Sequence, residues 1–320
     1  MTTVGTWWMW GGFLIFILFM IWLDLYALGG KRVHRVSLKE AASWSALWII
    51  LALFFNYLLW IYLRHTHTAA FADARALEFF TGYLLEKSLS VDNMFVFLMI
   101  FTYFNVPPEY QRRVLIYGVL GAIILRTIVI LFGSLLITEF HWVLYIFGAF
   151  LVFTGIKMLV FAEKENDLSE NVLLNWLKRH LPLTKDYEKE KFIVKQGIKW
   201  FFTPLFLVLI LIEVSDLIFA VDSIPAIFAV TTDPFIVWTS NIFAILGLRA
   251  LFFLLADMAD RFHLLKYGLA IILTFIGVKM LLMDIYKIPI AVALIVVAII
   301  LALSMFASLI TKPKPAKRAE

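Results

Sequence analysis

The segment Glu86-Lys-Ser-Leu-Ser-Val-Asp92-Asn93 places charged residues inside a stretch that otherwise reads as a membrane span. A related segment, Asp216-Leu-Ile-Phe-Ala-Val-Asp222-Ser223, follows 130 residues later. Each has an acid, five intervening residues, and an Asp between Val and a small polar residue. Charges in the membrane interior are costly and usually mark an ion or proton pathway. The paired motifs therefore predict a duplicated membrane protein that handles ions.

The spacing of the acids constrains the helix that carries them. Six residues of α-helix rotate by about 600°, so the two acids lie about 120° apart and about 9 Å apart along the axis. One straight helix cannot aim both carboxylates at one ion. Either the helix unwinds between them, or each acid meets a partner from the other copy. Pro225 favours unwinding in the second copy, because it has no N–H for the carbonyl of Val221.

The composition predicts an all-α, polytopic membrane protein. Hydrophobic residues make up 63% of the chain and charged residues only 16%. No cysteine is present, which excludes disulfides, thiolate metal sites and cysteine nucleophiles. The net charge of +5 does not indicate nucleic-acid binding, because the basic residues fall almost entirely in loops. About nine transmembrane helices are expected, over residues 7–28, 44–63, 77–104, 114–137, 141–161, 203–230, 235–256, 264–286 and 288–310.

A three-helix unit occurs twice. Gly121-Ala-Ile-Ile-Leu-Arg126 resembles Ala244-Ile-Leu-Gly-Leu-Arg249, and Phe153-Thr-Gly-Ile-Lys-Met resembles Phe275-Ile-Gly-Val-Lys-Met. The first copy begins on one side of the membrane and the second on the other, so the repeats are inverted. Inverted repeats are typical of secondary transporters, whose substrate site lies near the midplane between the copies.

The predicted organisation follows from the repeats and the loops. It comprises two N-terminal helices (1–76), repeat one (77–161), a cytoplasmic linker (162–202) with an amphipathic helical portion near residues 172–181, repeat two (203–286), and a last helix with a basic tail (287–320). Twenty Lys and Arg residues fall on one side of the predicted membrane and three on the other. This bias predicts an outside N-terminus and a cytoplasmic C-terminus.

The residues around the predicted midplane suit a hard divalent cation. Carboxylate and other oxygen ligands fit Mg²⁺, Ca²⁺ or Mn²⁺, whereas Zn²⁺ and Cu⁺ usually recruit Cys or His. Asn93 and Ser223 offer neutral oxygens beside each Asp, and Glu213 lies one helical turn from Asp216. The alternative role for the acids is a set of ion pairs that lock the helices together. The predicted metal-site residues are Glu86, Asp92, Asn93, Glu213, Asp216, Asp222 and Ser223.

Other residues near the motifs receive structural roles. Arg126 and Arg249 are expected to be ion-pair partners of the acids. Lys157 and Lys279 occupy matched positions near span ends, where long side chains snorkel to the interface. The matched glycines, Gly155 and Gly277, are expected to permit close helix contact. Asp24 near the end of the first span is expected to be an interfacial acid.

Together, the two motifs, the nine spans and the loop between the repeats resemble the TerC family of integral membrane proteins, in particular its Alx-like branch. The resemblance covers essentially the whole chain. It implies metal-ion transport across a bacterial inner membrane, with manganese export the activity of that branch. It also implies that the motif acids Glu86, Asp92, Glu213, Asp216 and Asp222 are the functional ones.

Several functions remain open from the sequence. The favoured hypothesis is a proton-coupled exporter of Mn²⁺. The metal ion is then the substrate, and no prosthetic group is predicted. Crowded carboxylates in apolar surroundings would hold protons that an arriving ion must displace. A calcium/proton exchanger and a non-transporting scaffold for metal delivery are the alternatives. Enzymatic function is not predicted, since nothing indicates a nucleophile with a base or a substrate cleft. The predicted partners are the ion and the lipid bilayer, and the oligomeric state stays open.

Overall fold

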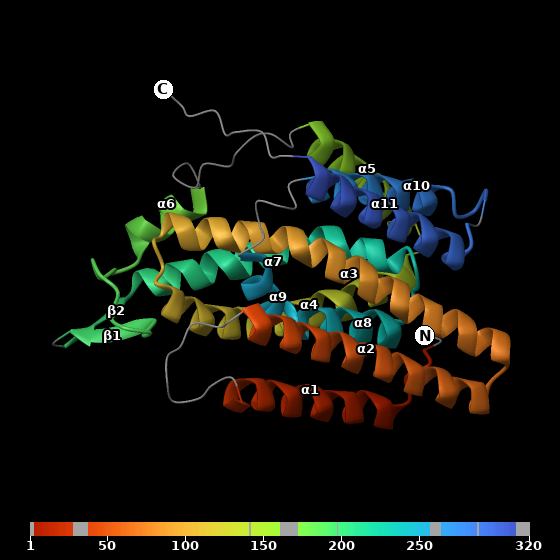
Figure 1. Ribbon diagram of the computed structural model, residues 1–320, viewed down its shortest axis with the longest axis horizontal. Coiled ribbons are helices and arrows are strands. Elements are labelled where there is room, and N and C mark those ends of the chain that lie inside the picture. Colours follow the sequence, from red (N-terminus) through yellow and green to blue (C-terminus); the bar gives the residue numbers. More distant parts are fainter. Residues whose placement is uncertain are drawn as a thin grey trace.

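Long helices, most of them roughly parallel or antiparallel, make up most of the molecule in this computed structural model (Figure 1). The structure describes residues 3–27, 38–140, 142–160, 172–196, 198–256, 264–286 and 288–311. The elements are α1 (Trp7–Ala27), α2 (Leu38–Thr66), α3 (Ala69–Tyr103), α4 (Pro108–Glu139), α5 (Val143–Val160), α6 (Val172–His180), β1 (Ile193–Gln196), β2 (Lys199–Phe202), α7 (Pro204–Phe228), α8 (Pro234–Leu246), α9 (Leu248–Ala256), α10 (Leu265–Leu281) and α11 (Ile290–Ile310).

Local sequence explains where several helices begin. Proline occupies the first turn of α4, α7 and α8, where its missing N–H is not needed. Thr68 caps α3 by accepting a hydrogen bond from the backbone N–H of Phe71. Asp233 caps α8 and also accepts hydrogen bonds from Thr3 and from the backbone N–H of Val4, which fixes the N-terminal segment against α8.

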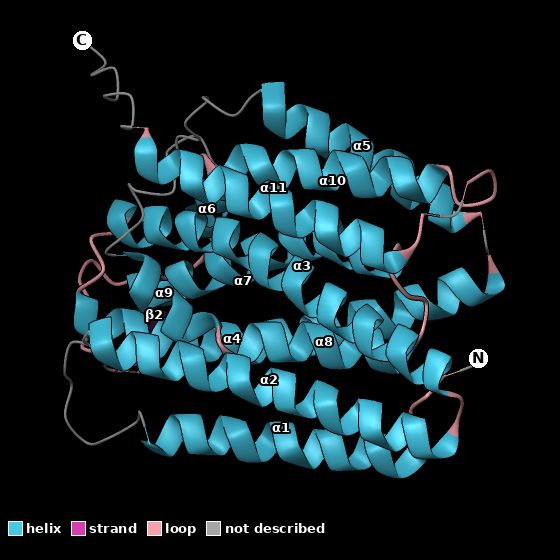
Figure 2. Cartoon of the chain, turned by 45° about the vertical axis from the view of Figure 1, so that its right-hand side comes forward, coloured by secondary structure: helices cyan, strands magenta, loops and turns pink. Residues whose placement is uncertain are grey.

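The helices form three layers (Figures 1 and 2). One outer layer holds α1 and α2, and the other holds α5, α10 and α11. The middle layer contains α3, α4, α7, α8 and α9, and every residue of α8 is buried. The end of the bundle that carries α6, β1 and β2 is called the hairpin end, and the opposite end is called the N-terminal end (Figure 1).

Length and composition support a multi-pass membrane protein. Five helices of the described chain are long and apolar enough to cross a membrane, and the bent pair α8–α9 makes a sixth candidate. The apolar part of α1, Trp7–Leu23, is shorter, α10 has 17 residues, and α3 carries charges at its centre. Each of the nine predicted spans is covered by a helix, except that the span over residues 235–256 is covered by two, α8 and α9. That all nine cross the membrane stays a prediction.

Glycines bring α5 and α10 into close contact, as the sequence predicted. A Cβ atom on Gly277 would lie 2.7 Å from the carbonyl oxygen of Gly148, and one on Gly155 would lie 2.7 Å from that of Ala270. Only hydrogen at these positions lets the two backbones approach so closely. The third helices of the two predicted repeats therefore pack directly on one another.

The break in the described bundle falls at Gly247, between α8 and α9, rather than in the second motif. The two helices meet at a 43° bend, so the span predicted over residues 235–256 is bent near its middle. Lys87 extends from α3 and donates a hydrogen bond to the carbonyl of Ala244, near the end of α8. A cation at a helix C-terminus interacts favourably with the carbonyl groups that lack helical partners.

The expected unwinding of the second motif is wrong. Helix α7 continues through both acids and through Pro225. Its end follows within one turn, and the backbone N–H of Ala229 donates to the carbonyl of Pro225. A proline this close to the helix end disturbs few hydrogen bonds, and the residues around it are buried by packing.

The predicted linker contains more structure than one helix. Its amphipathic portion is helical, as α6. The strands β1 and β2 then form an antiparallel hairpin in which Val194 pairs with Phe201, and this hairpin leads directly into α7. Tyr187 donates a hydrogen bond to the carbonyl of Phe104, which holds the segment against the end of α3. Burial raises the pKa of Tyr187 to about 12, so this donor stays protonated.

Candidate functional site: a buried ion-paired centre

The first acids of the two motifs lie at the middle of the bundle. Glu86 is the central residue of α3, and Asp216 is the central residue of α7. Their residues are 0% and 2% exposed to solvent, respectively. The two helices run in opposite directions, because α3 ends and α7 begins at the hairpin end (Figure 1). The fold therefore brings together two acids that are 130 residues apart in the sequence.

Arg126 of α4 joins these two acids. Its Nε and Nη2 atoms donate to the two carboxylate oxygens of Asp216, at 3.1 and 2.8 Å. Its Nη1 atom forms an ion pair with Oε1 of Glu86. The arginine is completely buried, so these bonds are shielded from water. Paired donors in a planar fork are the geometry in which Arg binds carboxylates most strongly.

Two neutral side chains complete the network, and neither was predicted as a site residue. Asn241 of α8 donates to Oε2 of Glu86 at 3.2 Å and accepts a hydrogen bond from Nη1 of Arg126 at 3.4 Å. Ser90 donates to Oε1 of Glu86 at 3.4 Å. Asn241 could have been noticed as an isolated amide within the predicted span over residues 235–256. Its connection to the motifs comes only from tertiary contacts.

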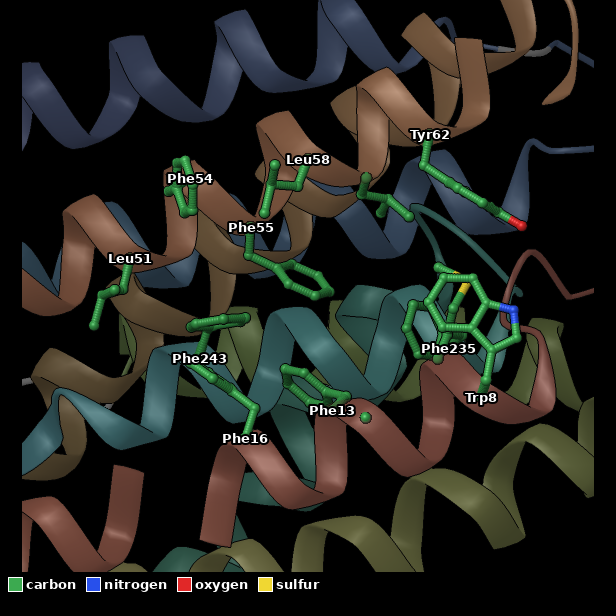
Figure 3. Close-up of a pocket in the computed structure, with 13 residues that line it drawn as sticks. Trp8, Phe13, Phe16, Leu51, Phe54, Phe55, Leu58, Tyr62, Phe235 and Phe243 are labelled. Carbon is green, nitrogen blue, oxygen red and sulfur yellow. The ribbon is translucent and has the colours of Figure 1, made fainter. Parts of the chain in front are cut away.

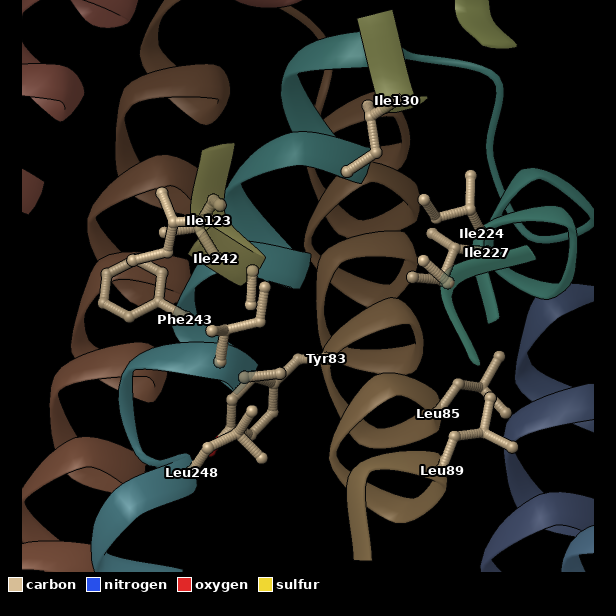
Figure 4. Packing of buried hydrophobic residues seen from close by; sticks show 14 of the residues in the cluster. Tyr83, Leu85, Leu89, Ile123, Ile130, Ile224, Ile227, Ile242, Phe243 and Leu248 are labelled. Carbon is tan, nitrogen blue, oxygen red and sulfur yellow. The ribbon is translucent and has the colours of Figure 1, made fainter. Parts of the chain in front are cut away.

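Apolar side chains enclose this centre. Leu85 and Ile242 are the sequence neighbours of Glu86 and Asn241, and Ile123 lies about one helical turn before Arg126. All three are buried in the hydrophobic core (Figure 4). Low polarity around the ions strengthens each electrostatic contact and raises the cost of leaving any charge unpaired. Two carboxylates and one guanidinium leave one net negative charge here, which suits a site that attracts cations.

Glu213 lies one turn before Asp216, towards the hairpin end. Its carboxylate lies against Gly121 of α4, so closely that a side chain at that position would collide with it. Its Oε2 atom is buried and accepts no hydrogen bond from the part of the chain that the structure describes. A buried carboxylate oxygen without a donor is uncommon and calls for a functional or structural explanation.

A small cavity opens beside the network. It has a volume of about 10 Å³ and is bordered by Asp216, Arg249, Gly118 and Ala122. This volume is close to the minimum that holds one water molecule. Arg249, expected to pair with the acids, borders this cavity together with Asp216 and is 4% exposed. Arg126 forms ion pairs with Glu86 and Asp216.

The second acids of the motifs lie away from the centre, on opposite sides of it. Asp92 is six residues beyond Glu86 towards the hairpin end, and its side chain lies outside the described residues. Asp222 is six residues beyond Asp216 towards the N-terminal end and interacts with Thr154 and Lys157 of α5. Six residues correspond to about 9 Å of helix.

The neighbours of the second acids are both buried. Asn93 is 3% exposed and Ser223 is 2% exposed. The hydroxyl of Ser223 has no hydrogen-bond partner among the described residues. Within those same residues, no three Asp, Glu, His or Cys side chains gather closely enough to hold a metal ion. The seven predicted ligands are thus distributed along the bundle, and Glu86 and Asp216 meet through Arg126.

Lys279 does not snorkel as predicted. It is 9% exposed and donates a hydrogen bond to the carbonyl of Ala229, at the end of α7. The nearby Glu78 carboxylate adds a favourable charge and is itself bound by Arg75 and Thr231. The lysine therefore caps α7 inside the bundle. Lys157, its counterpart in repeat one, is exposed. Asp24 lies in α1, and its side chain is outside the described residues.

A large apolar groove lies apart from this centre, between α1, α2 and α8 (Figure 3). Its volume is about 540 Å³, and aromatic and aliphatic side chains such as Phe13, Phe54, Phe55 and Phe243 form its walls (Figure 3). The groove offers almost no polar contact for an ion. The candidate functional site is therefore the buried network around Arg126.

The fold and this centre define a polytopic α-helical membrane protein with ionised groups paired in its interior. The chain belongs to the TerC family of integral membrane proteins, whose family model matches residues 71–316. The resemblance noted from the motifs is thereby confirmed.

Close relatives extend over nearly the whole chain. A protein of Salmonella typhi named "Putative membrane-bound redox modulator Alx" is 57% identical over 305 residues, covering 95% of each chain. The protein of that name in Escherichia coli K12 is 58% identical over 304 residues, also covering 95% of each chain. An "Uncharacterized membrane protein STKORF319" of Myxococcus xanthus is 46% identical over 308 residues, which make up 96% of this chain and 94% of that protein. No solved structure matches.

Proposed function

We propose that this chain is a divalent metal-ion transporter of the bacterial inner membrane and that its substrate is manganese(II), moved out of the cytoplasm. The observation that carries the proposal is the buried pair of acids, Glu86 and Asp216, contributed by the two matched motifs at the centre of the bundle. Charged groups at this depth are rare in membrane proteins and mark ion pathways. Membership of the TerC family supports a transport role.

The remaining predicted ligands are proposed to line the route to this centre. Asp92 and Asn93 lie towards the hairpin end, with Glu213 between that end and Asp216. Asp222 and Ser223 lie towards the N-terminal end. A cation crossing the bundle would then meet oxygen atoms on both sides of the centre, as Mn²⁺ prefers.

Reciprocal packing supports the proposed inverted repeats. Helix α3 packs on α8 and α7 packs on α4, so each first helix contacts the second helix of the other copy. The third helices, α5 and α10, pack on each other. Such an arrangement supports alternating access, in which one unit rocks against the other around a central site. The proposed topology has nine spans, an outside N-terminus and a cytoplasmic hairpin end.

Proton coupling forms part of the proposal. Metal ions bind carboxylates in their ionised form, so an ion that meets protonated acids along the route releases their protons, whereas Glu86 and Asp216 are ion-paired with Arg126 and release none. Metal loading from the cytoplasm and proton loading from the outside would then amount to exchange.

Two alternatives remain for the same centre. A calcium/proton exchanger would use the same oxygen ligands, and a non-transporting scaffold would bind metal without moving it. The names of two of the relatives mention a redox role. This chain cannot perform thiol-based redox chemistry, because it contains no cysteine.

Flux measurements on the purified protein test these functions. We expect sealed vesicles of known orientation to accumulate Mn²⁺ in the export direction and a pH-sensitive dye to report protons moving the opposite way. Preference for Ca²⁺ in the same assay would favour the calcium exchanger. Bound metal without flux would favour the scaffold, and flux without a proton signal would leave a uniporter.

A further inference from the structure

The Arg126 guanidinium occupies the place where a substrate cation would bind. Every carboxylate oxygen of Glu86 and Asp216 has a polar partner in the network, and three of these four oxygens contact the arginine itself. Guanidinium cannot lose its proton in a protein, so its charge can leave the site only if the side chain moves. The two acids are therefore already bound by a cation that is tethered to α4.

Charge balance indicates that substrate and arginine do not share the site. Two carboxylates are neutralised by one divalent ion. If Arg126 stayed against the same oxygens, three positive charges would face the two negative charges of Glu86 and Asp216, and the two cations would repel each other at short range. The cavity that Asp216 borders has only about 10 Å³, so it does not provide space for a second cation beside that acid. Binding of the ion requires that the arginine release the acids.

A second acceptor for the arginine lies close by. Glu213 lies against Gly121, on the same helix as Arg126, and is one turn from Asp216 on α7. Its buried Oε2 atom accepts no hydrogen bond within the described part of the chain. The absence of a bulky side chain at Gly121 leaves the carboxylate facing α4. An acceptor one turn from Asp216 would then be available to the guanidinium after it leaves that acid.

We propose that Arg126 is an internal competitor of the transported ion: it neutralises Glu86 and Asp216 in the unloaded protein and transfers to Glu213 when a divalent cation binds. This inference rests on the proposed transport function, because Arg126 can act as a competitor only if a transported cation binds Glu86 and Asp216. Arg126 is a positioning and selectivity residue in this scheme. It keeps the empty centre neutral enough to close, and only an ion that binds the two acids more strongly than guanidinium displaces it.

The test is the affinity for Mn²⁺ of the purified full-length protein, measured by titration calorimetry and by the paramagnetic resonance of free Mn²⁺. Removing the competitor in Arg126→Gln should tighten binding on the order of tenfold or more, as expected when charge-assisted hydrogen bonds no longer have to be broken. Arg126→Lys, which keeps the charge but loses the fork, should fall between that variant and the original protein. Arg75→Gln removes an ion pair with Glu78 far from the centre and should leave affinity unchanged.

Glu213 supplies a second, independent readout. Glu213→Gln should weaken Mn²⁺ binding when Arg126 is present, because the displaced arginine loses its acceptor. The same change in an Arg126→Gln background should have a much smaller effect, whereas a residue that acts only as a ligand would weaken binding equally in both backgrounds. Equal weakening in both would overturn the proposed transfer.

Failure of this inference differs from failure of the proposed function. If the original protein transports Mn²⁺ but folded Arg126→Gln and Arg126→Lys variants bind it no more tightly, Arg126 is not a competitor. If the original protein neither binds nor transports Mn²⁺, Mg²⁺ or Ca²⁺, both the function and the inference are wrong. Arg126→Lys retains a buried cation for the two acids and keeps the test available if Arg126→Gln does not fold.

Discussion

At the scale of residues, the function depends on how many charges the interior contains and which of them are paired. Glu86, Arg126 and Asp216 would each be costly alone, since an uncompensated buried charge destabilises a protein by about 3–5 kcal/mol. Together with Asn241 they satisfy most of each other's hydrogen-bonding groups. The same arrangement leaves the centre with one negative charge, so stability and attraction for a cation come from the same few side chains.

Asp216→Asn should reduce Mn²⁺ transport by about a hundredfold or more while the protein still inserts into the membrane. The substitution keeps the shape of the side chain but removes a charged ligand, and a loss of several kcal/mol corresponds to such a factor. Asp92→Asn and Asp222→Asn are expected to impair transport as well. The measurement is the initial rate of flux in vesicles, normalised to the amount of inserted protein.

Asp73→Asn is the matched control for these substitutions. Asp73 lies in the first turns of α3 and accepts a hydrogen bond from Trp60, which an asparagine oxygen can still accept. Its transport rate should equal that of the original protein. A normal rate in well-expressed Asp216→Asn would remove this acid from the site.

At the scale of elements, close backbone contact between α5 and α10 joins the two predicted repeats. Glycines at positions 148, 155 and 277 let the helices approach to a distance that a methyl group would prevent. Helix association in lipid relies on packing of this kind, because burial of apolar surface gives little driving force there. The contact also fixes where one unit can move against the other.

Gly277→Ala should lower the thermal stability of the purified protein, by roughly 1–3 kcal/mol in unfolding free energy. The added Cβ would lie 2.7 Å from the carbonyl oxygen of Gly148 and 2.8 Å from Val152. Gly11→Ala in α1 is the control, because no atom lies within 4 Å of the Cβ that it adds. Alanine favours helix over glycine, so the control should be neutral or slightly stabilising. Equal unfolding temperatures for the two variants would show that the α5–α10 contact is not tight.

At the scale of the whole molecule, orientation in the membrane decides the direction of transport. The basic residues in the sequence of α6, β1, β2 and their connections predict, by the positive-inside rule, that the hairpin end faces the cytoplasm. The loop between α2 and α3 lies at the N-terminal end and would face outwards. Because the chain has no cysteine, single cysteines can report this topology directly.

A membrane-impermeant maleimide should label His65→Cys in intact cells and Ile198→Cys only after the membrane is opened. His65 is exposed at the end of α2, and Ile198 is 94% exposed in the hairpin between β1 and β2. Labelling of Ile198→Cys in intact cells would reverse the orientation and, with it, the proposed export. The unsubstituted chain serves as the control for background labelling.

The sequence by itself determined the class of protein, the family and the positions of the helices. Apolar runs of sufficient length must be helical in a bilayer, where every backbone group needs an internal partner, so length and composition were enough. The motif acids also stood out, because a charge in an apolar run has few explanations. Close contact at Gly155 and Gly277 was predicted on the same local grounds.

Only the tertiary structure decided which of these residues meet. Local sequence predicted a break at Pro225, yet α7 continues through it, and the break occurs at Gly247, where Lys87 reaches the end of α8. Asn241 joined the centre, although it is far from both motifs in sequence. Lys279 is buried against α7 instead of reaching the interface. Each of these outcomes depends on the rotation and depth of one helix against its neighbours, and periodicity along a single chain does not contain that information.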